Sequence, residues 1–138
     1  MSDSKQLTIA IHEAFSNNAF DQVLALCHEN VEVHAHAFGA VFTGKEGFMQ
    51  FMQSFKTGFP DVRIAHEHFV VEGGSVAVQF TGRGTHTGTL QTPAGDIPAT
   101  GKKVELHVAE FLVWENGKLR SLHNYQDAGS LLRQIGAM

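Results

Sequence analysis

The sequence holds little of what several specialised classes of protein need. It has a single cysteine, Cys27, so no disulfide can form within the chain. No apolar run approaches the roughly 18 residues of a membrane-spanning helix. The segment from Met1 to Lys5 lacks the apolar stretch of a secretory signal. We therefore expect a cytoplasmic protein without disulfides, in which Cys27 is a small buried core residue.

Positive charge is also scarce. Ten basic residues face fourteen acidic ones, which leaves a net charge of −4. Nucleic acids and anionic membranes are bound by clustered lysine and arginine. We therefore expect no nucleic-acid partner and no membrane partner.

Apolar residues are abundant by contrast. They make up 43% of the 138 residues, and eleven of them are phenylalanine. A chain of this length fits one domain, residues 1–138, which can bury roughly two-thirds of its unfolded surface. So many bulky rings in a short chain predict a wide apolar interior or an apolar cavity.

The first half of the chain has the periodicity of helices. Apolar residues recur at helical spacing over residues 7–15 and 20–27. Thr43 and Glu46 have the spacing of a capping box, which predicts a helix start. That helix carries an apolar face made of Phe48, Phe51, Met52 and Phe55. Between the second and third helices, residues 31–37 alternate as a strand does.

The second half has the period of strands. Alternating runs predict strands at residues 63–71, 76–81, 104–114 and 118–125, with a loop at 91–101 and a short helix at 128–135. Asn116-Gly117 between the last two runs is a strong hairpin signal. Helices on one side of an antiparallel sheet give an α+β domain. A strongly curved sheet around helices forms a cone that can hold a small apolar ligand.

Several short segments resemble one family when they are taken together and in order: Gly44-Lys45-Glu46-Gly47, Phe59-Pro60-Asp61, Gly84-Thr85-His86-Thr87-Gly88, Ala99-Thr100-Gly101-Lys102, Asn116-Gly117-Lys118-Leu119, and Asp127 with Leu131 to Gly136. The chain resembles the SnoaL-like polyketide cyclases, of the superfamily of nuclear transport factor 2. The resemblance implies a cone-shaped α+β fold and a homodimer, or a tetramer, that pairs through the open sheet face. It also implies ring closure by intramolecular aldol condensation, without metal or cofactor, and an aspartate as the acid/base.

The resemblance places the acid/base near the last strand, where Asp127 is the only carboxylate. An alternative register places it near His123 or Asn124, where this chain has an amide. An aspartate is a useful base only if burial raises its pKa. An enolate also needs a hydrogen-bond donor at its oxygen, and His107, His123, Tyr125 and Gln79 are candidates.

The predicted hairpin brings these groups together. In an extended strand His123, Tyr125 and Asp127 share one face, and across the turn His107 lies near Asp127 and Glu110 near His123. We therefore predict Asp127, His107 and His123 as catalytic residues. The residues predicted to contact substrate are Gln79, His86, His36, Tyr125, Glu110, Phe51 and Phe55.

Structural alternatives stay open for several of these residues. Asp127 is also suited to be the N-cap of the last helix, and His86 between glycines suits a turn. His34 with His36, and His66 with His68, are spaced so that each pair shares a face, as a metal site requires. Such a site needs a third ligand. Chance pairs are common among nine histidines, so no metal is predicted.

The leading hypothesis is a small cofactor-independent enzyme that cyclises or isomerises a hydrophobic carbonyl compound through an enolate. Two alternatives remain. One is another enzyme on the same fold, an epoxide hydrolase or a dehydratase. The other is a non-catalytic module for ligand binding or dimerisation.

Overall fold

The computed structural model describes residues 3–92 and 94–138. Its elements are, in chain order, α1 Ser4–Ser16, α2 Phe20–Ala25, β1 Cys27–Ala35, the 3-10 turn η1 His36–Phe38, β2 Ala40–Thr43, α3 Gly44–Lys56, β3 Arg63–Glu72, β4 Ser75–Thr85, β5 Leu90–Thr92, β6 Gly95–Ile97, β7 Lys103–Glu115, β8 Lys118–Gln126 and α4 Ala128–Gln134.

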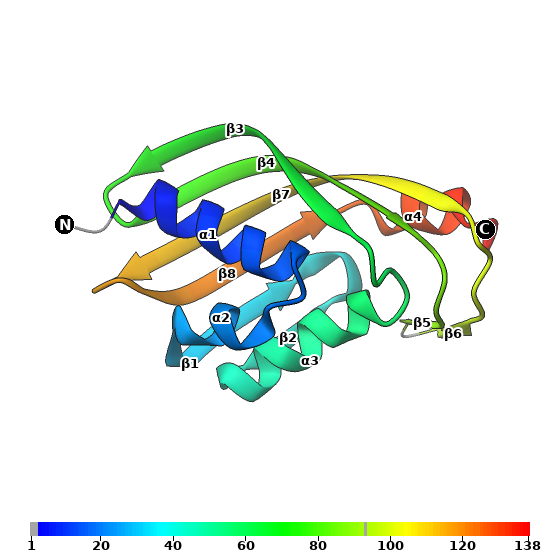
Figure 1. Cartoon of the computed structure of the whole chain (residues 1–138), viewed down its shortest axis with the longest axis horizontal. Coiled ribbons are helices and arrows are strands. Elements are labelled where there is room, and N and C mark those ends of the chain that lie inside the picture. The colour runs from blue at the N-terminus through cyan, green and yellow to red at the C-terminus, as the bar shows by residue number, and fades with distance from the viewer. Residues whose placement is uncertain (1–2, 93) are drawn as a thin grey trace.

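Six strands form one sheet in the order β2-β1-β8-β7-β4-β3, and β5 and β6 form a small separate ribbon. The pair β1–β8 is parallel, whereas the other neighbours in the large sheet are antiparallel. The long strands β3, β4 and β7 sweep across the molecule (Figure 1). The expected α+β fold with a curved, mostly antiparallel sheet is therefore confirmed.

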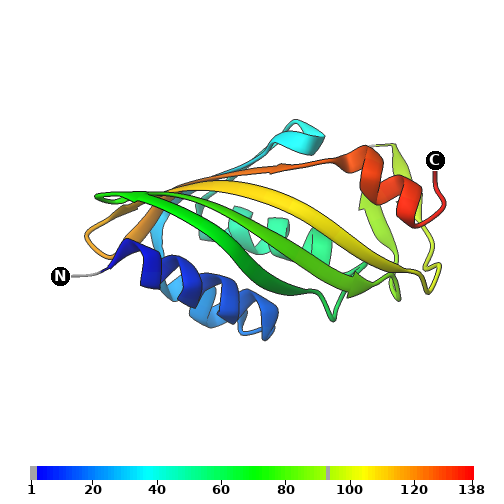
Figure 2. The same ribbon diagram turned by 90° about the horizontal axis from the view of Figure 1, so that it is seen from above.

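Among the described residues, helices cover one face of the sheet. Figure 2 shows α1, α2 and α3 on the same side, whereas η1 projects on the other side and α4 closes one end. Strand β7 shows the consequence, since its buried residues alternate with exposed ones and, at Ala109, with a half-buried one. We call the helix-covered side the inner face and the opposite side the outer face.

Helix α1 presents an unusual buried stripe of polar side chains. Ser4, Thr8, His12 and Ser16 recur every four residues, which places them on one side of the helix. Their polar groups are paired: Thr8 accepts a hydrogen bond from the indole of Trp114 at 3.0 Å, and Ser16 accepts one from the backbone of Ile64 at 3.0 Å. The stripe therefore joins α1 to the sheet without leaving these groups unpaired.

Two predicted turn features have different outcomes. Asn116 and Gly117 both have positive φ, 54° and 76°, and form the hairpin turn that the sequence predicts. The prediction of a capping box at Thr43 is wrong. Thr43 is at the N-cap of α3, but its side chain makes no capping hydrogen bond. Strand β2 and the ribbon β5–β6 were not predicted, because both are short and lack the alternation of the long strands.

Close backbone packing fixes one glycine of the Gly84–Gly88 segment. The amide of Gly88 donates to the carbonyl of Gly58 at 3.2 Å, and a Cβ on Gly88 would lie 1.9 Å from the carbonyl oxygen of Thr57. This segment is thus held against the end of α3 by main-chain contact.

Cys27 is buried and free, as the sequence predicts, and burial raises the pKa of its thiol to about 12. In the part of the chain that the structure describes, no helix has the length and apolar character needed to cross a membrane.

Candidate active site

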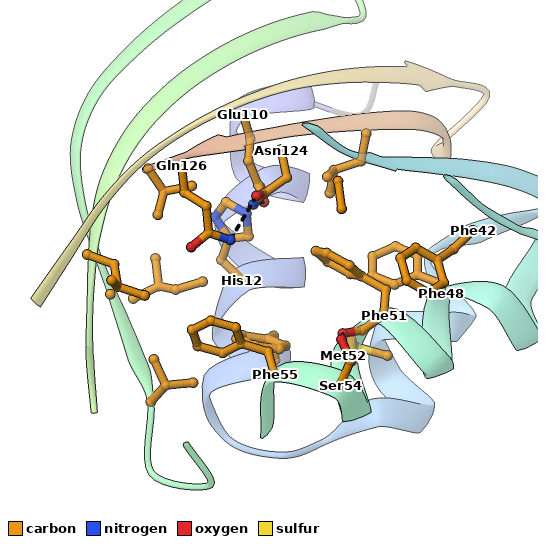
Figure 3. A pocket seen from close by; sticks show the side chains of 18 of the residues that line it. His12, Phe42, Phe48, Phe51, Met52, Ser54, Phe55, Glu110, Asn124 and Gln126 are labelled. Carbon is orange, nitrogen blue, oxygen red and sulfur yellow. Dashed lines mark hydrogen bonds and ion pairs between the residues drawn. The ribbon is translucent and has the colours of Figure 1, made fainter. Parts of the chain in front are cut away.

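An apolar cavity of about 190 Å³ lies between the inner face of the sheet and the helices (Figure 3). It exceeds the ~150 Å³ of an engineered cavity that holds benzene, so an apolar ring compound fits. Seven of the eleven phenylalanines line it, namely Phe15, Phe38, Phe42, Phe48, Phe51, Phe55 and Phe80. The expected hollow therefore exists and is not filled by these rings.

A buried polar chain crosses one wall of this cavity. The carboxylate of Glu110 accepts a hydrogen bond from His12 Nε2 at 2.7 Å on Oε1, and one from Asn124 Nδ2 at 2.7 Å on Oε2. Gln126 Nε2 in turn donates to Asn124 Oδ1 at 3.2 Å. All four residues line the cavity, and Figure 3 shows their side chains converging from α1, β7 and β8.

Strand and helix phase explain how these side chains reach the cavity. On β7, Glu110 occupies the buried phase that it shares with Val104, Leu106, Val108, Leu112 and Trp114. Asn124 stands opposite Glu110 on β8, so both amide and carboxylate point inward. His12 comes from the polar stripe of α1, 98 residues away in sequence. The exposed fractions of His12, Glu110 and Asn124 are 5%, 4% and 5%, so the carboxylate is shielded from bulk water.

The acceptor character of Glu110 fixes the orientation of both amides. An ionised carboxylate only accepts, so Asn124 turns its NH₂ toward Glu110 and its oxygen toward Gln126. Gln126 must then present its NH₂ to Asn124. Its own oxygen, Oε1, is buried and has no partner among the described residues. A buried unpaired acceptor in a cavity wall is suited to receive a donor from a ligand.

His66 on β3 extends this row of hydrogen-bonded polar side chains away from the cavity. Its Nε2 lies 2.8 Å from His12 Nδ1, and the two rings stack with centroids 5.0 Å apart. Burial, and then the charge of His12, lower the pKa of His66 to about 4. A neutral His66 that donates from Nε2 leaves His12 to donate from its own Nε2 to Glu110.

Comparison with known proteins agrees with this fold. The family model described as SnoaL-like polyketide cyclase matches residues 5–135. This chain belongs to the SnoaL-like polyketide cyclase family. A search of curated proteins finds no match.

Solved structures of the same fold cover nearly the whole SnoaL-like chain. A candidate SnoaL-like polyketide cyclase from Jannaschia sp. CCS1 shares 17% identity at a TM-score of 0.85, covering 98% of this chain and 92% of that one. AclR from Streptomyces galilaeus, a candidate hydroxylase, shares 18% at 0.83, covering 98% and 96%. IdmH from Streptomyces antibioticus, a candidate polyketide cyclase, shares 20% at 0.82, covering 98% and 99%. These similarities show the fold.

Asp127 lies outside the cavity of this SnoaL-like domain. It is the N-cap of α4, where its Oδ1 accepts a hydrogen bond from the amide of Ser130 at 3.1 Å. Its side chain is 69% exposed and lies 3.8 Å from Arg133. The expectation of a desolvated acid at this position is therefore wrong, because odd-numbered residues at the end of β8 face outward.

The other predicted partners of Asp127 share its outward direction. With Glu67 and Phe80, the groups Gln79, His107, Tyr125 and Asp127 line an open groove on the outer face. The predicted proximity of His107 and Asp127 is thus present, but in solvent, since the side chain of His107 is 73% exposed. Glu110 stands opposite Asn124 rather than His123, which pairs with Phe111. That part of the predicted register is wrong by one residue.

Three further predicted contacts also lie away from the cavity. His36 and His123 are on the outer face, where their ring nitrogens are 2.8 Å apart. His86 is fully buried against Phe59, and its Nδ1 accepts from the backbone of Thr100 at 3.3 Å. Of the residues predicted to touch substrate, the structure brings Glu110, Phe51 and Phe55 together in the cavity wall.

The histidine pair of β3 is split by an irregularity. The ladder with β4 shifts between His66 and His68, so that His66 stands opposite Phe80 and His68 opposite Gln79. His66 therefore turns inward to His12, whereas His68 is exposed. The prediction that these two side chains share a face is wrong.

The outer face carries exposed apolar side chains as well. Phe111 is 53% exposed, Val113 40% and Tyr125 43%. Such side chains are suited to contact a second copy, and the homodimer stays a prediction.

His12, Asn124 and Gln126 were missed as site residues. Part of the signal for them lies in strand and helix phase. Glu110 interrupts an apolar run in its buried phase, and Asn124 and Gln126 continue the phase of Leu122, which the register shift in the β7–β8 ladder offsets from that of Leu119. His12 follows Ser4 and Thr8 at four-residue spacing.

Proposed function

We propose that this chain is a cofactor-independent enzyme that moves a proton beside the carbonyl group of a hydrophobic substrate, and so cyclises or isomerises it through an enolate. One observation carries the proposal: the carboxylate of Glu110 is 4% exposed, lies in a Phe-lined cavity and is held from both sides by His12 and Asn124. A positioned base in a dry pocket is the main requirement for this chemistry.

Glu110 is the base in this mechanism. Its oxygens accept one hydrogen bond each and retain lone pairs for a further proton. Glu110 takes the proton from the carbon beside the carbonyl, and the C–H electron pair becomes the double bond of the enolate. In a cyclisation the enolate carbon then attacks a second carbonyl of the same molecule, and the new alkoxide takes the proton back. In an isomerisation the proton returns to another carbon. Neither route consumes a co-reactant.

His12 and His66 are positioning residues in this mechanism. The hydrogen bond from His12 to Glu110 keeps the carboxylate in one orientation, and His66 fixes which nitrogen of His12 carries the proton. Because His66 stays neutral down to about pH 4, it adds no positive charge beside the His12–Glu110 pair at neutral pH.

Gln126 supplies the polar contact with substrate. Its unpaired Oε1 accepts from a hydroxyl group or an enol, and the second hydrogen of its NH₂ is free for the enolate oxygen. The preferred substrate is therefore an apolar ring compound with a carbonyl and a neighbouring hydroxyl, rather than a pure hydrocarbon.

The test uses 2-tetralone, a bicyclic ketone, in D₂O, and follows loss of its α-proton signal by NMR. The wild type accelerates exchange, and Glu110→Gln lowers the protein-dependent rate at least ~100-fold, the lower range for loss of a general base. The matched control Asp127→Asn keeps the rate within about twofold, since Asp127 only caps α4. Full exchange in Glu110→Gln, or loss in Asp127→Asn, overturns the assignment of Glu110.

A hydrolase is the second candidate, favoured by the grouping of one carboxylate with two amides around the same wall. Such a group can orient a water molecule for attack on an epoxide. Incorporation of ¹⁸O from labelled water into a diol product distinguishes it from proton transfer, which incorporates none. Saturable binding of 2-tetralone without exchange would instead indicate a ligand-binding module.

A further inference from the structure

Three histidines gather on the outer face, on the opposite side of the sheet from the cavity. His34 on β1 stands opposite His123 on β8 in the parallel ladder, and their rings stack with centroids 4.2 Å apart. His36 in η1 brings its Nε2 to 2.8 Å from Nδ1 of His123. One ring nitrogen from each of the three lies within 4.8 Å of the other two.

The surroundings prepare these rings for a cation. The carboxylate of Glu32 lies 3.2 Å from Nε2 of His34, so this nitrogen donates its proton and Nδ1 keeps its lone pair. Histidines that bind metals commonly pass their other N–H to a carboxylate in this way. The ring of Tyr125 stacks on His36 with centroids 4.3 Å apart and 4° between the planes, which restricts the orientation of that ring.

The cluster is open to solvent on the outer face of the sheet. Because His36 is exposed and the other two are partly exposed, an ion reaches the site from solvent and water can complete its coordination.

We propose that His34, His36 and His123 form a binding site for a divalent transition metal ion, with Zn²⁺ as the preferred biological ion. Three imidazole nitrogens and one water make a common tetrahedral zinc site. Ligands at about 2.05 Å stand about 3.3 Å apart in that geometry, and partly exposed side chains reach it by rotation. The third ligand comes from β8, 87 residues from His36, which explains why the His34–His36 pair alone predicts no site.

The site is independent of the cavity, because alternate residues of a strand face opposite sides. Ala35, Leu122 and Asn124, next to the ligands in sequence, line the cavity instead. Binding of the metal and exchange of 2-tetralone can therefore be measured separately.

The test titrates the full chain with ZnCl₂ at pH 7.5 by calorimetry, and with CoCl₂ by visible absorption, whose intensity reports the coordination geometry. The wild type is expected to bind one equivalent. His123→Asn removes a ligand and weakens zinc binding at least 100-fold. Glu32→Gln leaves the ligands in place but replaces the charged acceptor for His34 by a neutral one, and weakens binding about tenfold, as changes of such outer partners do.

His107→Asn is the matched control, because it removes an exposed histidine from the same face of the sheet. Its zinc affinity stays equal to that of the wild type, and far-ultraviolet circular dichroism checks that each variant is folded. Equal zinc affinity in the wild type and in folded His123→Asn overturns the proposal, and so does a loss in His107→Asn as large as that in His123→Asn. If His123→Asn does not fold, His36→Asn, at the exposed end of the cluster, decides in the same way.

Discussion

The two faces of β8 carry similar polar groups under opposite conditions. Asn124 and Gln126 point inward, where Asn124 is 5% exposed and holds the buried carboxylate of Glu110. Tyr125 and Asp127 point outward, where Asp127 is 69% exposed and caps a helix. Asp127, which the sequence predicts as the acid/base, therefore lies on the outer face and not in the cavity. Burial, rather than residue type, therefore decides which side chain can act as a base.

Truncation of an apolar or aromatic side chain should give the largest difference in stability between the two faces. Leu122 on the inner face is 3% exposed, whereas Tyr125 on the outer face is 43% exposed. Leu122→Ala should lower the free energy of unfolding by about 2–5 kcal/mol, the range for buried leucine. Tyr125→Ala should cost less than about 1 kcal/mol. Urea unfolding measures both, and equal losses would contradict the distinction between the faces.

A charge on the inner face should have the next largest effect. Asn124→Asp places a second carboxylate beside Glu110, where the two atoms are now 2.7 Å apart. Repulsion raises the pKa of the pair in the folded state. Stability is then present in acid and lost as the pH rises through that pKa, by about 1–3 kcal/mol. Urea unfolding at pH 5 and pH 8 measures the loss.

Ser121→Asp, on the outer face of the same strand, is the matched control for that charge. It should change stability by less than about 0.5 kcal/mol at either pH, as surface substitutions do. A loss in Ser121→Asp as large as in Asn124→Asp would show that the strand, and not its inner face, is sensitive to charge.

On the outer face, Asp127 should contribute to stability only as the N-cap of α4. Asp127→Ala removes the hydrogen bond from the amide of Ser130 and should cost about 1 kcal/mol in the free energy of unfolding. Asp3→Ala, which removes the corresponding cap of α1, should cost a similar amount. If Asp127→Ala kept its stability but no longer catalysed proton exchange of 2-tetralone, Asp127 would be a catalytic residue after all.

The smallest expected effect concerns His66, because its ring is half-buried and partly screened by solvent. Its pKa is near 4 in the folded chain and 6.5 in the reference state. Between these values the unfolded chain binds more protons, so stability falls as the pH falls from 6.5 to 4. Between pH 4 and 6.5, the thermal unfolding temperature of His66→Gln should therefore depend less steeply on pH than that of the wild type. An unchanged slope would mean that His66 is not the group responsible.

Much of the fold could be predicted from local pattern. The alternation of Val104, Leu106 and Val108 identifies a strand, and Asn116-Gly117 identifies its turn, because both are properties of neighbouring residues. The short strands β2, β5 and β6 could not be predicted in this way. Their three or four residues carry too little periodicity, and their pairing depends on partners elsewhere.

The site could be predicted only in part. Phe51 and Phe55 belong to a helical apolar face, and Glu110 was among the residues expected near substrate. The role of Asp127 was sought on the wrong face, since the register between β7 and β8 shifts near Val113 and Trp114. A shift of one residue reverses the side of every following side chain.

The sequence by itself determined that helices and alternating strands would surround an apolar interior, because the spacing of Phe48, Phe51 and Phe55 is written into the chain. Only the tertiary structure decided which acid that interior would enclose. Helices cover one face of the sheet, and this coverage removes water from Glu110 while it leaves Asp127 in solvent. It also brings His12 to a carboxylate 98 residues away, a contact that no local pattern encodes.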